Sequence, residues 1–234
     1  MNKRGVTKQL HPKSGEARKI SAAGGTREPL LSVAVALFAE KGFDGVAVDE
    51  IVAAAGVNKR MVYHYFGSKE GLYRATLERV FEELGHLEEG LFALKSRPSN
   101  PEQALRNIVR TYFRFLLDHP QFVRLLLWEN LQHGTHISQV TVAVRKTPML
   151  AHLESVLLEG IRAGLFRPRL DTRLVLVSLI GLCLIYFSNR HALSWTVGID
   201  LSSPRALDRA VRHTADLLVA GLKKERQIPM HPEK

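Results

Sequence analysis

Hydrogen-bond donors and aromatic side chains gather in one short part of the chain, residues 58–69. This part contains Asn58, Lys59, Arg60, Met61, Tyr63, His64, Tyr65 and Lys69. Ammonium, guanidinium and phenol groups donate hydrogen bonds to anionic oxygens, and the planar guanidinium also matches the two acceptors on the major-groove edge of guanine. The residue types therefore indicate recognition of an anionic, hydrogen-bonding surface.

Two short amphipathic helices must position these donors. Apolar residues recur at helical spacing just before them, at Val48, Ile51, Val52 and Ala55. Gly56 can take the left-handed backbone that reverses the chain without steric cost. Asn58 is a good N-cap for a second helix, in which Val62 and Phe66 lie four residues apart and face inward. The spacing predicts a helix, a tight turn and a second helix.

Several further motifs surround this unit at fixed spacing. They are the run Phe38-Ala39-Glu40-Lys41-Gly42-Phe43, residues 51–57, and Val62-Tyr63 followed by Phe66 and Ser68-Lys69-Glu70. With these motifs, residues 27–75 resemble the DNA-binding domain of the TetR family of bacterial transcriptional regulators. The resemblance implies a three-helix domain. Its first helix, which Thr26 can cap and Gly42 ends, braces the other two.

The resemblance also implies which residues face duplex DNA. They are Ala47, Asn58, Lys59, Arg60, Met61, Tyr63, Tyr65 and Lys69. Arg60 is the best candidate to read a guanine, because side chains in the first turn of a recognition helix reach base edges. Lys69 follows Ser68, the expected cap of the next helix, so its ammonium joins a helix N-terminus directed at the phosphate backbone.

Members of this set also have a second interpretation. The cations among them could be ordinary solvated charges. Asn58 either only caps its helix or also touches a phosphate. Met61 either contacts a thymine methyl or packs inward, and Tyr63 and Tyr65 are either phosphate donors or partly buried aromatics with wet hydroxyl groups.

The sequence departs from the family pattern at some of these positions. Ala47 stands where a Thr or Ser usually caps the second helix and touches a phosphate, and loss of that cap costs ~1 kcal/mol. Its backbone amide remains able to bind a phosphate. Arg60 and Met61 replace a small residue and a Thr, and Tyr65 replaces a His. The operator sequence is therefore not predictable from a relative.

Charge is distributed unevenly along the 234 residues, whose net charge is +10. Residues 1–27 contain seven cations and one acid, whereas residues 28–75 contain five cations and six acids. We expect residues 1–25 to form a disordered basic arm, which is either a solvated tail or adds phosphate or minor-groove contacts. The segments expected after it are 26–75 for DNA binding, 76–225 for effector binding and dimerisation, and 226–234 as a tail.

Helical periodicity continues to about residue 225 with brief interruptions. No strand-like alternation of useful length occurs, so the chain is predicted to be all-α. Asn100, Asp171 and Ser203 are expected at helix starts. A long helix over about residues 135–163 is expected to kink near Pro148.

The last two helices, about residues 172–197 and 203–224, are the candidates for dimerisation. Residues 174–187 are apolar nearly all round, and such a helix must be covered on several sides. Two such helices from each subunit would build a four-helix bundle, which is also the interface that the resemblance implies. The alternative is that they only complete the core of a monomer.

A small-molecule pocket in the C-terminal domain is implied by the resemblance. Polar or aromatic residues at otherwise apolar positions are the candidates to line it: Tyr112, Trp128, Asn130, His152, Tyr186 and Asn189. Each is alternatively a core group with its hydrogen bonds satisfied. The effector, which the sequence does not name, is expected to be small and substantially apolar.

Other features argue against a membrane protein, an exported protein or an enzyme. The apolar run of 14 residues, 174–187, is shorter than the ~20 needed to cross a bilayer, and the N-terminus lacks a signal peptide's apolar core. The single Cys183 cannot pair within the chain, which favours core packing and a reducing, cytoplasmic setting. No catalytic or cofactor motif occurs, and His133 and His136 are expected to be solvated loop residues rather than metal ligands.

The sequence therefore predicts a homodimeric, cytoplasmic transcription regulator, most simply a repressor that binds a near-palindromic double-stranded operator and responds to a small molecule. The alternative from another class is a helical ligand-binding or scaffolding protein whose helix-turn-helix makes protein contacts. An enzyme is a distant third.

Overall fold

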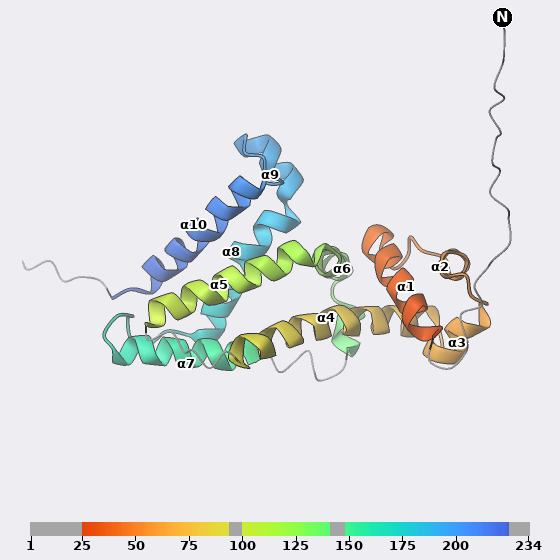
Figure 1. Ribbon diagram of the computed structural model, residues 1–234, viewed down its shortest axis with the longest axis horizontal. Helices are drawn as coiled ribbons and strands as arrows, with labels where there is room; N and C mark the ends of the chain where they lie inside the picture. The colour runs from red at the N-terminus through yellow and green to blue at the C-terminus, as the bar shows by residue number, and fades with distance from the viewer. Residues whose placement is uncertain (1–24, 94–99, 141–147, 225–234) are drawn as a thin grey trace, which may run out of the picture.

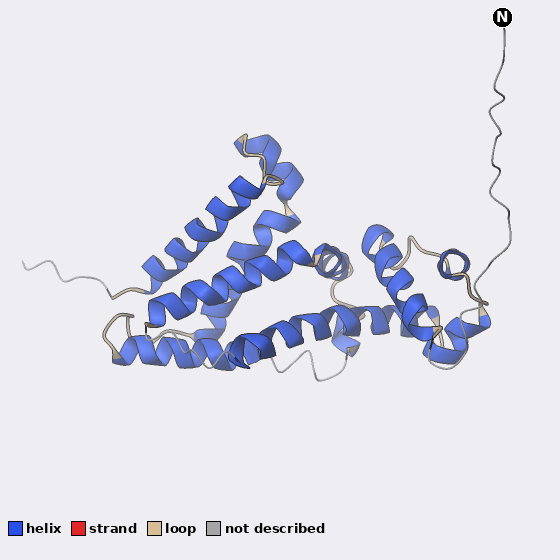
Figure 2. Cartoon of the chain, in the orientation of Figure 1, coloured by secondary structure: helices blue, strands red, loops and turns tan. Residues whose placement is uncertain are grey.

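The computed structural model describes residues 25–93, 100–140 and 148–224. Within these ranges all regular structure is helical, which confirms the predicted all-α class (Figure 2). The expected basic arm over residues 1–25 and the expected tail over residues 226–234 fall largely or wholly outside the described residues. No single described helix is long and apolar enough to span a membrane, although α8 and α9, bent by 79°, pass that length and composition test as a pair.

Three helices form a small head at one end of the molecule (Figure 1). They are α1 (Arg27–Lys41), α2 (Val48–Ala55) and α3 (Arg60–Phe66). Leu30, Phe38, Ile51 and Val62 are fully buried where the three helices meet. Burial of each such side chain contributes about 1.5–3 kcal/mol, so the shared core fixes α3 relative to α1 and α2.

One long helix joins the head to the rest of the chain. This helix, α4 (Lys69–Ala93), packs on α1 and α3 at its start and on α6 and α7 farther along. Tyr73, Leu72 and Leu77 are fully buried along its first half. A rotation of α4 therefore carries the head with it.

The remaining helices form the larger body. They are α5 (Pro101–Asp118), α6 (Pro120–Leu131), the 3-10 helix η1 (Ile137–Gln139), α7 (Pro148–Arg162), α8 (Thr172–Ser188), α9 (Arg190–Val197) and α10 (Pro204–Leu222). The predicted helix starts are confirmed by side-chain caps. Asn100 accepts from the Glu102 amide at 2.9 Å, Asp171 from the Arg173 amide at 2.8 Å, and Ser203 from the Ala206 amide at 3.3 Å.

Three predicted local structures are wrong. Thr26 makes no side-chain cap to α1. The helix expected from residue 135 is absent over residues 135–140, where turns and η1 stand instead, and Pro148 begins α7 rather than kinking a longer helix. The expected helix over 172–197 is two helices, because Asn189 adopts a non-helical conformation and its side chain bonds locally to Ser188.

Candidate nucleic-acid interface

The turn between α2 and α3 has the predicted geometry. Gly56 has φ of 65°, in the left-handed region, and its amide closes the end of α2. The Asn58 side chain accepts a hydrogen bond from the Arg60 amide at 2.9 Å, so it supports the first turn of α3 although α3 begins two residues later. Ala47 precedes α2 with extended backbone and no side-chain cap.

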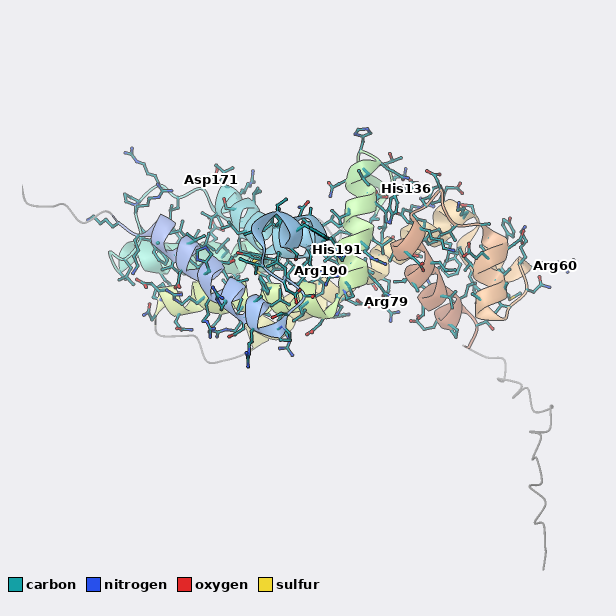
Figure 3. The ribbon with its side chains drawn as sticks, turned by 90° about the horizontal axis from the view of Figure 1, so that it is seen from above. Arg60, Arg79, His136, Asp171, Arg190 and His191 are labelled. Carbon is teal, nitrogen blue, oxygen red and sulfur yellow. The ribbon has the colours of Figure 1, made fainter. Side chains whose placement is uncertain are left out.

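The outer face of α3 carries polar and aromatic side chains. Arg60, Tyr63, His64 and Tyr65 are exposed, whereas Val62 on the opposite face is fully buried. Figure 3 shows Arg60 at the outer edge of the head, directed away from the body. Arg60 has no ion-pair partner among the described residues, so its guanidinium is free to meet a base edge or a phosphate.

Met61 and Phe66 flank this outer face and are partly buried. Met61 packs against the core of the head. Of its two alternatives, contact with a thymine methyl or inward packing, the structure shows inward packing. The Arg27 guanidinium lies 5.1 Å from the centre of the Phe66 ring, at the end of α3. A cation on the first turn of α1 thus stands beside the outer face, and the sequence interpretation did not include it.

Acidic side chains of α2 are paired with nearby cations. The Lys59 ammonium lies 2.9 Å from a carboxylate oxygen of Asp49, and Lys41 pairs with Glu50. Hydrogen bonding to these carboxylates raises the pKa of each lysine above its usual value. Such exposed ion pairs contribute little in water, so Lys59 can exchange Asp49 for a phosphate. The pairing also masks the negative charge of α2.

The start of α4 lies against α3 and belongs to the candidate interface. Ser68 Oγ accepts from the Gly71 amide at 3.0 Å, which confirms the predicted cap. The pKa of the Glu70 carboxyl lies below its usual value because its own backbone amide and the Ser68 hydroxyl bond to the carboxylate. The Lys69 ammonium lies 4.4 Å from the centre of the Phe43 ring. In this structure Lys69 therefore rests on an aromatic face of the head.

Phe43 is also the point where the head meets the body. The His136 ring lies 4.7 Å from Phe43 and 4.9 Å from Tyr73, centre to centre. His136 is buried, so its expected role as a solvated loop residue is wrong, whereas His133 is exposed. No group of three potential metal ligands occurs among the described residues.

A buried carboxylate holds His136 in this place. Glu129 of α6 is 1% exposed. It accepts hydrogen bonds from the His136 amide at 3.1 Å, the Ile137 amide at 2.8 Å and His136 Nδ1 at 3.1 Å. The two amides follow a turn in which His133 and Gly134 both have positive φ. Burial, then the nearby Glu129 charge, raise the pKa of Tyr73 above its usual value.

Other contacts strengthen the same junction. Gly42 has φ of 73°, and a Cβ built there would lie 2.9 Å from the Trp128 ring, so a side chain at this position would displace the ring. Gln132 donates to Asp44 at 3.0 Å, and Arg79 of α4 pairs with Glu28 of α1. We call the set Phe43, Tyr73, Glu129 and His136 the junction cluster. The burial of Glu129 as a charged group was not predicted from the sequence.

The six expected pocket residues lie in different surroundings. Tyr112 is buried on α5, and Trp128 packs on Gly42 at the junction. Asn130 and Asn189 are exposed and bond within or beside their own helices. His152 is partly buried on α7. Tyr186 lines an open groove of about 470 Å³ between α8 and α10.

Comparison with known proteins identifies relatives of both parts of the chain. The family described as bacterial regulatory proteins, tetR family, matches residues 30–76, and the Tetracyclin repressor-like C-terminal domain matches residues 101–218. The HTH-type transcriptional repressor NicS of Pseudomonas putida is 32% identical over 200 residues, which cover 85% of this chain and 93% of NicS.

Solved structures share the fold. The fatty acid degradation regulator FadR of Bacillus halodurans has a TM-score of 0.63 and 23% identity, over 88% of this chain and 100% of that one. FadR of Bacillus subtilis, in complex with stearoyl-CoA, has a TM-score of 0.62 and 22% identity, over 83% of this chain and 98% of that one. At these low sequence identities the similarity shows only that the helices are arranged in the same way.

Proposed function

The chain belongs to the TetR family of bacterial transcriptional regulators, and from that premise we propose that it is a homodimeric repressor that a small molecule releases from its operator. The observation that carries the proposal is the outer face of α3, where Arg60, Tyr63 and His64 are exposed on a helix whose opposite face is locked into the head. Relatives named as transcriptional repressors support the same direction of regulation.

Each head would place α3 in a major groove. In this arrangement Arg60 reads a base edge, and Asn58, Lys59, Tyr63 and Tyr65 surround it as contacts to bases or phosphates. Ala47 contributes a backbone amide, and the start of α4 with Lys69 meets the phosphate backbone. Because Lys59 and Lys69 already rest on an exposed carboxylate and a ring, respectively, binding needs only local side-chain rotation.

A second copy would pack on the face formed by α8 and α10. Leu174, Val177 and Ile185 of α8 and Leu217 of α10 are large apolar side chains exposed on that face. Covering such a face removes apolar area from water, which favours association. Two heads held this way would present their α3 helices to half-sites about 34 Å apart on a near-palindromic duplex.

The effector would bind in the body and act on the heads through α4 and the junction cluster. Tyr112, Trp128, His152 and Tyr186 remain the candidates nearest to buried or grooved parts of the body. The effector can release DNA only through a higher affinity for the released arrangement of the heads than for the bound one.

Salt-dependent, sequence-selective DNA retention tests the proposal. Purified full-length protein is incubated with genomic fragments at moderate ionic strength, bound fragments are footprinted, and compounds are then screened for release. We expect protection of two half-sites about one helical turn apart and loss of affinity as salt rises. Retention that shows no preference among sequences would instead favour a scaffolding protein and overturn the assignment.

A further inference from the structure

A cation at the start of α1 stands beside α3. Arg27 is exposed, and its guanidinium carbon lies 5.1 Å from the centre of the Phe66 ring, at the end of α3. It is not among the residues that the sequence analysis expects on DNA. A guanidinium is attracted to an aromatic face even at an exposed site. The ring therefore determines where this charge stands.

The core of the head fixes both partners of this contact. Leu30 and Leu31, one turn after Arg27, are buried. Residues three and four positions apart lie on the same side of a helix, so the Arg27 side chain leaves α1 next to its buried side. Phe66 is partly buried against the same core, and α1 packs on α3. The packing of the head thus sets the position of the guanidinium.

The charge of Arg27 is not neutralised within the described part of the chain. Glu28, the acid next to it in sequence, pairs with Arg79 of α4 instead. Among the described residues Arg27 has neither an ion pair nor a side-chain hydrogen bond, in contrast to Lys59, which pairs with Asp49. A ring face offers no anionic oxygen, so the guanidinium keeps its donors for an outside acceptor. Such a group suits the oxygens of a phosphate.

The end of α3 is also where a DNA backbone would pass. In helix-turn-helix complexes, residues at the start of the recognition helix meet base edges, and the far end of that helix can contact the backbone. Arg60 begins α3 and Phe66 ends it, so these two positions are about 9 Å apart along the helix axis. Since the major groove is about 12 Å wide, this displacement carries Arg27 from the bases toward a strand at the edge of the groove.

We propose that Arg27 binds a phosphate of the operator backbone, beside the base pairs that α3 reads. The proposal rests on the DNA-binding regulator proposed above, and it adds a contact from α1, whose expected role was only to brace α2 and α3. Phe66 holds the guanidinium near its bound position, so little side-chain freedom is lost on binding. Because a phosphate contact carries no sequence information, Arg27 adds affinity to every operator variant alike.

The salt dependence of DNA binding provides the first test. The logarithm of the binding constant falls with the logarithm of the salt concentration, with a slope of about −0.9 per neutralised phosphate. In a homodimer Arg27→Gln removes two such contacts, so the slope should become less steep by about 1.8 and binding should weaken roughly 2- to 30-fold. Arg27→Lys keeps the charge and should retain most of the slope. An Arg27→Gln protein with the slope and affinity of the wild type overturns the contact.

Operators with a single neutral methylphosphonate locate the contact. On the operator found by footprinting, each phosphate of one half-site is replaced in turn. We expect one position, or two adjacent ones, where the replacement weakens binding of the wild type but not of Arg27→Gln. Replacements elsewhere should affect the two proteins alike. If every replacement affects both proteins equally, Arg27 does not touch the backbone and the proposal is overturned.

A matched arginine separates this contact from a general effect of charge. Arg162 is exposed on the last turn of α7, in the body. Arg162→Gln removes the same charge and should bind DNA with the affinity and salt slope of the wild type, so equal losses for the two variants would refute the role of Arg27. A wild-type protein without preference among sequences overturns the proposed regulator itself, whereas selective binding that Arg27→Gln leaves unchanged overturns this contact alone.

Discussion

Replacing Glu129 with leucine should destabilise the junction between head and body. The substitution keeps an apolar stem of similar size but removes the acceptor of three hydrogen bonds, from the His136 amide, the Ile137 amide and His136 Nδ1. Each buried donor left without a partner costs about 1–3 kcal/mol. Partial relaxation of the loop reduces the sum, so we expect the free energy of unfolding to fall by about 3–5 kcal/mol.

Urea unfolding followed by circular dichroism measures this change. With a slope of about 2 kcal/mol per molar urea, the transition midpoint should fall by roughly 1.5–2.5 M. Glu129→Gln keeps one carboxamide oxygen as acceptor and should lose less. Glu154→Leu is the control, because Glu154 is exposed on α7. If Glu129→Leu unfolds within about 1 kcal/mol of the wild type, the carboxylate does not organise the junction.

The same variant should change how DNA is read. When His136 is no longer held against Phe43 and Tyr73, each head can turn more freely on the body. The affinity for a single half-site should then change little. The ratio of the affinity for a correctly spaced operator to that for an operator lengthened by two base pairs should fall. A variant that keeps the full spacing preference would show that the junction cluster does not set the separation of the heads.

Three further outcomes follow from single positions. Arg60→Ala should cost about 1–3 kcal/mol and relax selectivity at one base pair, whereas Lys69→Ala should weaken all sequences alike; equal losses across an operator library would contradict the role of Arg60. Gly42→Ala should lower the free energy of unfolding by more than Gly56→Ala. Both glycines have positive φ, but only at Gly42 would the added Cβ lie 2.9 Å from an aromatic ring. Equal melting temperatures for the two variants would contradict this. Burial raises the pKa of the Cys183 thiol to about 12 from 9.0, so alkylation at pH 8.5 should occur only after unfolding, and rapid alkylation of the folded protein would show that the thiol is accessible. The contribution of the neutral thiol to the free energy of unfolding should be complete below about pH 9 and decline as the pH rises toward 12.

Local chemistry explains why much of the head could be predicted from sequence. Gly56 provides the left-handed residue of the turn, and Asn58 and Ser68 bond to amides two and three residues ahead. These interactions join near neighbours in the chain, so residue type and spacing determine them. The same holds for the caps at Asn100 and Asp171 in the body.

Interactions between distant segments explain what could not be predicted. The segment after residue 135 forms only the short helix η1, which ends where Val140 adopts an extended conformation. The bonds from its His136 and Ile137 amides to the buried Glu129 join it to α6, and helical periodicity contains no sign of them. The partner of Lys59 is Asp49, which meets it only because the turn folds α3 against α2. The dispersal of the expected pocket residues has the same origin, since an aromatic or polar residue in an apolar stripe does not reveal which neighbouring helix faces it.

The junction cluster is well placed to couple effector binding to the spacing of the heads. Phe43 belongs to the head and contacts both Lys69, at the start of α4 that is proposed to face DNA, and His136, which Glu129 anchors to the body. Shifting a two-state equilibrium from 1:99 to 99:1 requires about 5.5 kcal/mol of differential binding. Loss of the hydrogen bonds of Glu129 is expected to cost a comparable amount, about 3–5 kcal/mol. An effector that displaces α6 would therefore replace the present contacts of the junction cluster with a different set. The heads would then move as rigid units, because their own core is unaffected.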